Sequence, residues 1–216
     1  MQDFVVLTGI IIKSEPIGEY DRRVVILTKE RGKISAFARG ARKPNNRLMA
    51  PTNPFSFGQF RLYATRNSYN MSDAEISNYF EELRQDFVGA YYGMYFFEIC
   101  DYYTRENNDE KEMLKLLYQS LRALTSPKFD NHLVRCIFEL KSLIISGEFP
   151  QITSLSGISE GAAYTIDYII KTPAEKLYSF TVKEDILQEL EEFCKKMCKM
   201  LIDKDFKSLE ILENIE

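Results

Sequence analysis

The 216-residue sequence predicts an α+β protein, with a five-stranded barrel at residues 1–78 followed by an all-α helical domain at residues 79–216. Short runs rich in β-branched residues occupy the first part, and apolar residues at helical spacing occupy the second. Positive charge also concentrates in the first part. Hydrophobic residues make up 45% of the chain, which is enough to build a sizeable core.

Five segments in the first part are expected to form strands. They are Phe4–Lys13, Arg22–Thr28, Lys33–Ala41, Phe55–Thr65 and Met71–Tyr79. Pro16 and Gly18 are expected to break the first strand, Gly32 to turn the chain between the second and third, and residues 66–70 (RNSYN) to turn it before the fifth. Such spacing suggests a closed barrel of the OB-fold type, which commonly binds nucleic acid. An SH3-like barrel is the competing topology, and spacing alone does not exclude it.

The third predicted strand has two different faces, because successive side chains alternate across a sheet. One face carries Ile34, Ala36 and Ala38, and the other carries Lys33, Ser35, Phe37 and Arg39. A basic face with an aromatic ring in its middle can follow a phosphate backbone and stack a base. In the alternative interpretation Phe37 packs on a neighbouring element, and Lys33 and Arg39 are merely exposed.

The second part is predicted to be a helical bundle. Helices are expected at Tyr79–Glu106, from 107–109 to Leu124, at His132–Ser146, at Ser159–Ile170 and at Lys183–Ile202. The helix at His132–Ser146 is almost wholly apolar, which is typical of a helix at the centre of a bundle. Two of its basic residues, Arg135 and Lys141, could border a docking groove, unless burial makes them structural.

Charge divides the chain more sharply than its formal net charge of −4 suggests. Residues 1–70 hold 12 Lys and Arg against 5 Asp and Glu, whereas residues 71–216 hold 16 against 27. The 42 residues from Arg31 to Ser72 contain eight basic residues and no acid. Natural surfaces usually intersperse the two signs, so this stretch indicates an anionic partner more strongly than a solvated basic face.

The sequence contains no enzyme signature. It has no GxxxxGK[ST] phosphate loop, no HExxH, no paired CxxC and no GxSxG elbow, and its single histidine, His132, excludes a site that needs two. Cys194 and Cys198 share one helical face, where inward packing is the commoner explanation than half of a metal site. The four cysteines are expected to be reduced and buried.

The opening residues MQDFVVLTGIIIK argue against a signal peptide, because an acid precedes a short apolar run and no small-residue cleavage site follows it. No apolar stretch reaches the roughly 18 residues that suggest a membrane span. The chain is therefore expected in the cytoplasm, with no membrane partner.

Four segments resemble the RecO family of bacterial recombination mediators. They are EYDRRVVILTKERGKISAFARGARKPNNRL at 19–48, APTNPFSFGQFRLY at 50–63, GEFPQI at 147–152 and FKSLEIL at 206–212. The first is similar to that family's Asp-Arg, strand, Gly-Lys turn and Gly-Ala-Arg-(Arg/Lys) segment. The last two resemble its Gly-x-x-Pro-x-Leu turn and its Ser-Leu ending. The resemblance runs nearly end to end and keeps the order of the pieces.

The resemblance implies an OB-fold followed by a helical domain, in a non-enzymatic protein that binds single- and double-stranded DNA. It also implies that the protein anneals complementary strands, works with RecR, contacts the acidic C-terminal tail of single-stranded-DNA-binding protein and helps load RecA at gaps. Many family members carry a four-cysteine zinc site after the Gly-x-x-Pro-x-Leu turn. This chain reads TSLSGISEGAAY there, so no zinc and no other cofactor is predicted.

Composition and resemblance indicate the same candidate DNA-binding residues. Arg22, Arg23, Lys33, Arg39, Arg42, Lys43 and Arg47 are predicted to neutralise phosphates, and Tyr20 and Phe37 to stack bases. Residues 42–54 are expected to form a loop that three prolines stiffen, and its order without DNA is left open. Two other classes remain: an adaptor whose basic barrel docks an acidic protein, and an RNA-binding barrel.

Overall fold

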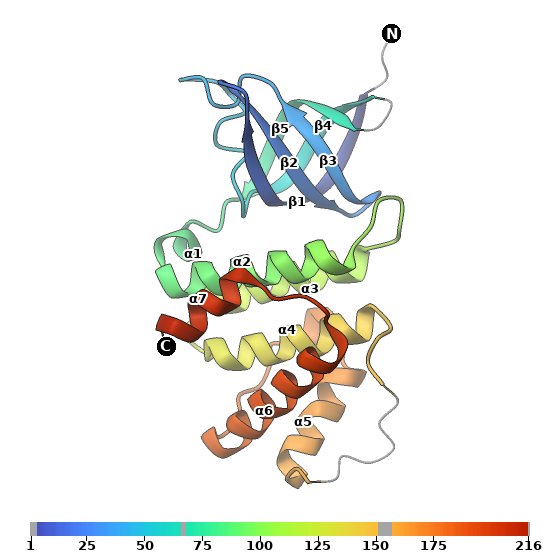
Figure 1. Ribbon diagram of the computed structural model, residues 1–216, viewed down its shortest axis with the longest axis vertical. Helices are drawn as coiled ribbons and strands as arrows, with labels where there is room; N and C mark the ends of the chain where they lie inside the picture. The colour runs from blue at the N-terminus through green and yellow to red at the C-terminus, as the bar shows by residue number, and fades with distance from the viewer. Residues whose placement is uncertain (1–3, 66–67, 151–156, 216) are drawn as a thin grey trace. The chain divides into compact units, whose positions relative to one another are not determined.

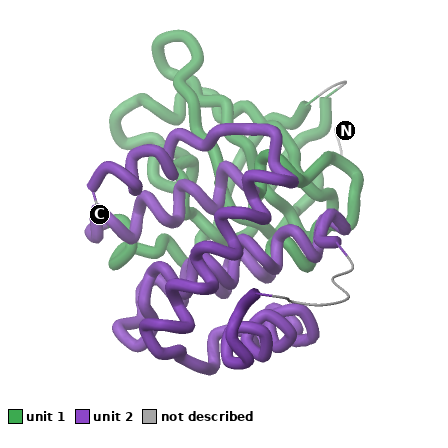
Figure 2. Tube along the Cα trace, turned by 60° about the horizontal axis from the view of Figure 1, so that its bottom comes forward, with its two compact units in different colours: residues 1–84, 100–114 green, residues 85–99, 115–216 purple. Residues whose placement is uncertain are grey.

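A computed structural model describes residues 4–65, 68–150 and 157–215 (Figure 1). The chain forms two compact units, one of residues 1–84 with 100–114 and one of residues 85–99 with 115–216 (Figure 2). The expected domain boundary at residue 78 stays a prediction. Parts of three sequence segments lie outside the described residues: the RNSYN turn, the end of GEFPQI and the start of the cysteine-free segment.

The barrel strands are β1 (Phe4–Ile17), β2 (Asp21–Thr28), β3 (Gly32–Ala38), β4 (Phe57–Ala64) and β5 (Tyr69–Asn78). They close in the order β1-β2-β3-β5-β4, and β1 pairs with both β2 and β4 (Figure 1). Neighbouring strands are antiparallel except β3 and β5, which pair in parallel. This Greek-key closure confirms the OB-fold rather than the SH3-like alternative.

Alternation along the strands builds the barrel core. In β3 the side chains of Ile34, Ala36 and Ala38 are buried, as the sequence predicts, and they meet inward residues such as Phe60 and Leu62 of β4. Side chains at the intervening positions lie outside this core. The barrel interior is therefore apolar, and basic side chains are left to the outside and to the connecting segments.

The expected break of β1 at Pro16 is wrong. The strand continues to Ile17, and Pro16 pairs with Arg22 of β2. The ladder between β1 and β4 ends at Ile10, so this part of β1 has a single partner strand. Proline lacks a backbone N–H, and such an edge tolerates it because no second ladder needs that donor.

The strand expected at Lys33–Ala41 ends early, at Ala38. Gly40 takes a positive φ of 68°, and a run of turns follows it as far as the start of β4. Arg39 therefore lies on a turn rather than on the outer face of a strand. The structure extends the loop expected at 42–54 in both directions.

The turn between β2 and β3 is joined to residues 104–110 within the same unit. The Lys33 amide donates to the Arg105 carbonyl at 3.0 Å, and the Asn107 amide donates to the Arg31 carbonyl at 3.0 Å. Gly32 sits between them with a φ of 63°, and a Cβ at this position would lie 2.3 Å from the Arg105 carbonyl oxygen. A residue other than glycine would push this segment away.

Eight helical elements follow the barrel in the described part of the chain. They are α1 (Glu81–Gln85), α2 (Phe87–Tyr103), α3 (Lys111–Leu124), α4 (Asn131–Ile145), α5 (Glu160–Lys171), a 3-10 turn (Ala174–Lys176), α6 (Glu184–Leu201) and α7 (Lys207–Ile215). The single helix expected at Tyr79–Glu106 starts only at Glu81, because Phe80 has a φ of 50°, and it is divided at Asp86, where the chain leaves helical geometry. The sequence interpretation missed α7.

Helix α4 is central to its unit, as predicted, and packs against α5 and α6. Phe138 stacks on Phe96 at 4.1 Å between ring centroids. Glu139 is only 1% exposed, and its Oε1 accepts from the Tyr95 hydroxyl at 2.7 Å and from Arg135 Nε at 2.8 Å. Burial opposes the charge of Arg135, but the Glu139 carboxylate raises the pKa of that guanidinium.

The Gly32 geometry predicts a large loss of stability for Gly32→Ala. The substituted residue would carry a strained positive φ and collide with the Arg105 carbonyl, so we expect the free energy of unfolding to fall by about 2 kcal/mol or more. Gly18→Ala is the matched control, because Gly18 has a φ of 55° and a Cβ there would meet no other atom within 4 Å. It should lose only about 1 kcal/mol. Equal losses of unfolding free energy for the two variants in urea denaturation would show that the close approach of Gly32 to Arg105 does not matter for stability.

Candidate nucleic-acid interface

The β1–β2 turn and the segment after β3 meet at one end of the barrel. Together they line a shallow concavity of about 500 Å³. Its lining residues are Ile17, Gly18, Glu19, Tyr20, Asp21, Arg39, Gly40, Lys43 and Asn46. Three of the predicted contact residues, Tyr20, Arg39 and Lys43, are thereby brought to one place.

Hydrogen bonds from backbone amides join the two segments. The Gly40 amide donates to Asp21 Oδ1 at 2.7 Å, and the Arg42 amide donates to the Tyr20 carbonyl at 2.8 Å. Lys43 Nζ lies 5.1 Å from the centroid of the Tyr20 ring, within cation–π range. The Tyr20 residue is 42% exposed, and a side-chain hydrogen bond with Glu19 raises the pKa of its phenol. The ring is therefore available for stacking at neutral pH.

The cations at this end differ in how far the chain itself engages them. Arg39, Arg42 and Lys43 are exposed. Within the described residues the Arg39 side chain has no hydrogen bond or ion pair, and Arg42 Nη1 only reaches the Gly18 carbonyl at 3.3 Å. These three side chains can turn toward a ligand without breaking a strong internal contact.

Arg22, in contrast, is directed into the loop. Its Nη1 atom lies 3.1 Å from the Met49 carbonyl, 3.0 Å from Thr52 Oγ1 and 2.7 Å from Asn53 Oδ1. Burial lowers the pKa of Arg22, and the positive charge of Arg42 lowers it further. The guanidinium stays charged at neutral pH, since its ordinary pKa is far higher. Its Nη1 group is therefore engaged by the loop.

Arg23 and Phe37 form a separate pair on the outer face of the barrel. They lie opposite each other on β2 and β3. Arg23 Nε donates to Ser35 Oγ at 2.9 Å, and Phe37 is half-buried. An exposed arginine beside a partly exposed ring leaves both of the interpretations of this face open.

Arg47 lies toward β5. Its Nη2 donates to the Ser72 carbonyl at 2.7 Å, and its Nε lies 3.8 Å from Asp73 Oδ1. The side chain is still 69% exposed, so a loose ion pair of this kind contributes little energy and can be exchanged for a phosphate.

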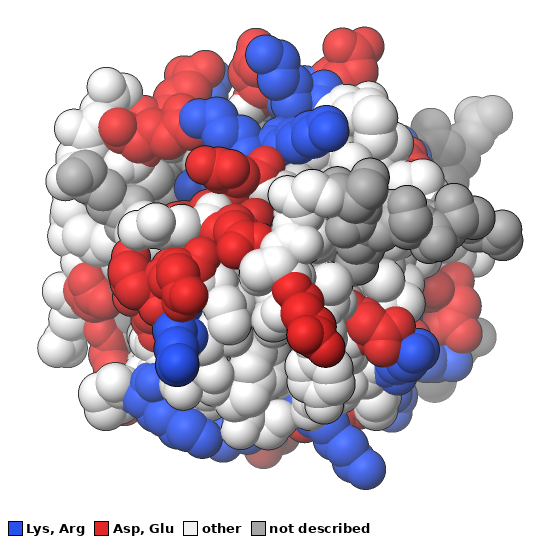
Figure 3. All heavy atoms as spheres, turned by 90° about the horizontal axis from the view of Figure 1, so that it is seen from below, with Lys and Arg blue, Asp and Glu red and all other residues white. Residues whose placement is uncertain are grey.

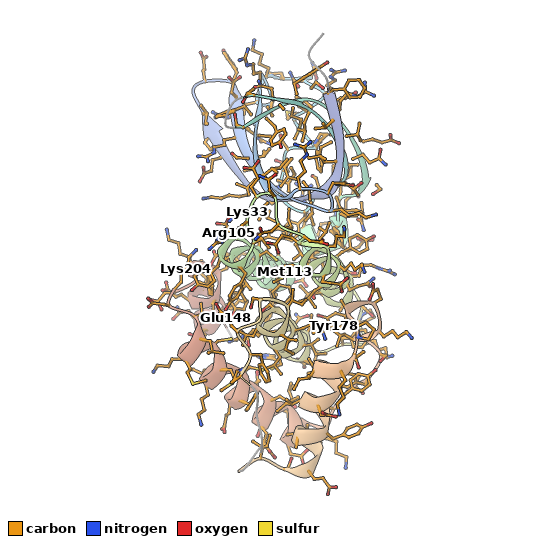
Figure 4. All side chains as sticks on the ribbon, turned by 90° about the vertical axis from the view of Figure 1, so that its right-hand side faces the viewer. Lys33, Arg105, Met113, Glu148, Tyr178 and Lys204 are labelled. Carbon is orange, nitrogen blue, oxygen red and sulfur yellow. The ribbon has the colours of Figure 1, made fainter. Side chains whose placement is uncertain are left out.

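Lys33 is far from this end. Arg39 lies six positions further along the chain, which corresponds to about 20 Å along a strand. Lys33 Nζ lies 2.9 Å from Asp101 Oδ1 and also donates to the Asp101 carbonyl, and its side chain is only 21% exposed. In Figure 4 Lys33 is labelled close to Arg105, and backbone hydrogen bonds join the Arg105 segment to the β2–β3 turn. This placement suits a structural lysine better than a phosphate contact.

The structure also adds residues that the sequence interpretation missed. Asp21 is an acid within a basic cluster, and its carboxylate accepts a hydrogen bond from the Gly40 amide. Thr52 and Asn53 supply the acceptors for Arg22. Asp21 and Arg22 form the Asp-Arg pair of the segment that resembles the RecO family, so the sequence did point to these two residues. One sequence could not reveal which loop groups they bind.

In the described part of the helical unit, the face shown in Figure 3 and one groove both carry mixed charge. On the face shown in Figure 3, Asp and Glu lie among Lys and Arg. A groove of about 450 Å³ in this unit contains Arg135, yet its lining has five acids and four bases. Lys141 is buried, and its Nζ caps α5 by donating to the Ile169 and Ile170 carbonyls. Both basic residues of α4 are thus structural.

No cluster of three or more potential metal ligands occurs within the described part of the chain. Cys100, Cys136 and Cys194 are buried as expected, whereas Cys198 is only partly buried. Burial raises the pKa of the Cys100, Cys194 and Cys198 thiols. High thiol pKa values keep these side chains protonated and unreactive. His132 pairs with Glu191 at 2.6 Å and packs edge-on against Tyr92. The absence of zinc stays a prediction.

The barrel and the bundle define an α+β protein of the OB-fold class with a basic loop at one barrel end. The family model described as "Recombination protein O N terminal" matches residues 1–80, and "Recombination protein O C terminal" matches residues 84–157. These matches span well over half of the chain, and the chain therefore belongs to the RecO family. None of the described helices is long and apolar enough to cross a membrane.

Curated relatives agree with this assignment. DNA repair protein RecO of Acetivibrio thermocellus is 26% identical over 97% of this chain and 96% of its own length. The protein of the same name from Clostridium acetobutylicum is 28% identical over 96% of each chain. The one from Bacillus subtilis is 31% identical over 67% of this chain and 56% of its own length.

The Lys33–Asp101 pair predicts that Lys33→Ala acts on stability. Because a charge-assisted hydrogen bond in a partly buried position is lost, we expect the free energy of unfolding to fall by about 1–2 kcal/mol. Asp101→Ala should cost a similar amount, and the double variant should cost little more than either single one. Additive losses in urea denaturation would mean that the two side chains do not act as a pair.

Proposed function

We propose that this chain is a non-enzymatic recombination mediator that binds single- and double-stranded DNA through the basic end of its barrel. The observation that carries the proposal is the grouping of Arg39, Arg42 and Lys43 beside the exposed Tyr20 ring, on a stretch of chain without acids. Membership of the RecO family supports DNA repair as the setting, since its curated members are named DNA repair proteins.

Phosphate neutralisation is the main role proposed for the cations. Arg23, Arg39, Arg42, Lys43 and Arg47 are exposed and can release counterions from a DNA strand. Such contacts carry little sequence information, which suits a protein that must act at any gap. Tyr20 and Phe37 are proposed to stack bases, with Tyr20 the more accessible of the two.

Strand annealing follows from the same surface. Two complementary strands repel each other, and a basic barrel end with exposed, long side chains can lower the repulsion without ATP. We propose that the chain anneals complementary strands in this way and, with RecR, helps load RecA onto gaps coated with single-stranded-DNA-binding protein. The acidic C-terminal tail of that protein is proposed as a further partner, and the cytoplasm, at repair sites on the nucleoid, as the location.

Two other classes of function make different predictions. An adaptor that docks an acidic protein would bind no nucleic acid, and an RNA-binding barrel would prefer RNA. Filter binding to single-stranded DNA, duplex DNA and RNA of one sequence, over a salt series, distinguishes the three. The proposal requires binding to both forms of DNA, and a clear preference for RNA or the absence of binding to all three would contradict it.

The exposed cations predict the salt dependence of binding. If about five phosphates on a single strand are engaged, log K should fall with log salt at a slope of about −3.5. Changing Arg39, Arg42 and Lys43 together to Ala should weaken binding and make the slope shallower by about 2. The measurement is fluorescence anisotropy with an oligothymidylate. The matched control changes three exposed lysines of the helical unit, Lys196, Lys199 and Lys207, to Ala. An equal change in affinity and slope for the control variant would show that the DNA site is not at the basic barrel end.

Annealing is the second test. We expect the pure protein to accelerate annealing of complementary oligonucleotides about tenfold or more at low salt without any nucleotide, because a basic surface raises the local concentration of both strands. A fluorescence-quenching assay measures the rate. The triple variant should lose most of the acceleration. Equal rates with and without the wild-type protein would exclude annealing as an activity of this chain alone.

A further inference from the structure

The connection between β3 and β4 is unusually long for an ordered segment. It runs from Ala38 to Phe57 and holds 18 residues that are in neither a helix nor a strand. Loops of this length are generally functional or disordered. This one carries Arg39, Arg42 and Lys43, so whether it is held in shape before binding determines how strongly those cations can act.

One end of the loop is held by Asp21. Its Oδ1 accepts from the Gly40 amide at 2.7 Å, at the point where Gly40 turns the chain with a φ of 68°. The neighbouring Tyr20 carbonyl accepts from the Arg42 amide at 2.8 Å. Both bonds fix the backbone on either side of the first exposed cations.

The far part of the loop is held by Arg22. Its Nη1 atom reaches Met49, Thr52 and Asn53, the three acceptors at 2.7–3.1 Å. Thr52 is itself fixed, since it is fully buried and its Oγ1 donates to the Leu48 carbonyl at 2.6 Å. A hydrogen bond to a charged group is stronger than one between neutral groups, which makes this contact a strong clamp.

The loop also closes the barrel end with apolar side chains. Ala41 and Leu48 belong to the barrel core cluster and are 0% and 5% exposed. The exposed cations therefore alternate with anchored residues along one short stretch. Loss of a clamp at either side should free the cations without unfolding the barrel, because the strands keep their own ladders.

We infer that Asp21 and Arg22 are positioning residues, which hold the basic loop at residues 39–54 in its binding shape before nucleic acid arrives. The inference rests on the proposed function for its consequence, namely tighter binding. A preformed loop binds more tightly because the ligand does not have to order it. Arg22, predicted from sequence to contact a phosphate, is thus assigned to a different task from Arg39, Arg42 and Lys43.

Hydrogen exchange in the DNA-free protein tests the clamp itself. We expect Arg22→Ala to speed exchange of the Met49, Thr52 and Asn53 amides about tenfold or more, with the strands of the barrel unaffected. Arg23→Ala is the matched control, since Arg23 is the same residue type one position along and bonds only Ser35 in the described residues. Unchanged loop exchange in Arg22→Ala would overturn the inference, whatever the protein binds.

Binding to an oligothymidylate tests the consequence. A clamp predicts that Arg22→Ala weakens binding about threefold to tenfold with the salt slope unchanged, whereas a phosphate contact would make the slope shallower by about 0.7. Arg22→Lys keeps the charge but shortens the reach, so a clamp predicts weaker binding here too. Wild-type affinity for Arg22→Lys, together with a shallower slope for Arg22→Ala, would overturn the inference.

Asp21→Ala distinguishes the two explanations, because they predict changes of opposite sign in DNA affinity. Removal of an acid from a basic cluster should strengthen DNA binding if electrostatics alone mattered. Loss of a positioning residue should instead weaken it about threefold to tenfold, and Asp21→Asn, which keeps an acceptor for the Gly40 amide, should restore most of the affinity. Tighter binding by Asp21→Ala would overturn the role of Asp21. If the wild type bound no DNA, the proposed function would fail, and the exchange result alone would still decide the clamp.

Discussion

Closure of the barrel through β1 determines where everything else in this unit can lie. β1 bonds β2 along one edge and β4 along the other, and Gly9 pairs with both Thr28 and Gly58. A Cβ on Gly9 would lie 2.3 Å from the Leu27 carbonyl oxygen, and one on Gly58 2.1 Å from that of Glu75. The strands close tightly because these positions lack side chains. Closure leaves a strand edge at the end of β1 beyond Ile10, and charge is confined to the outer face and the loops.

The basic loop shows how that charge is accommodated. Its apolar residues Ala41 and Leu48 complete the core, and its cations point away from it. Like charges so close together repel one another: burial is the main cause that lowers the pKa of Arg22, and the positive charge of Arg42 lowers it further. An anionic strand would relieve this repulsion. The surface is therefore a mild cost to the folded barrel, and under the proposed function the same charge provides the affinity for nucleic acid.

Much of this arrangement could be predicted from sequence, because alternation and composition are local properties. They predicted the five strands, the inward face of Ile34, Ala36 and Ala38, the central α4 and the basic barrel. The partners of single side chains could not be predicted. Lys33 pairs with an acid 68 residues away, and Arg22 turns into a loop some 30 residues further on. Such contacts depend on how the closed barrel brings distant segments together, which cannot be worked out from one sequence.

Hydrogen exchange of the whole chain, with and without a saturating oligothymidylate, shows whether single-stranded DNA lies on the basic barrel end. We expect slower exchange at residues 17–23 and 37–49 in the complex, and no change in α5 or α6. Protection confined to the helical unit, or no protection anywhere under conditions where binding is measured, would contradict this placement of the DNA.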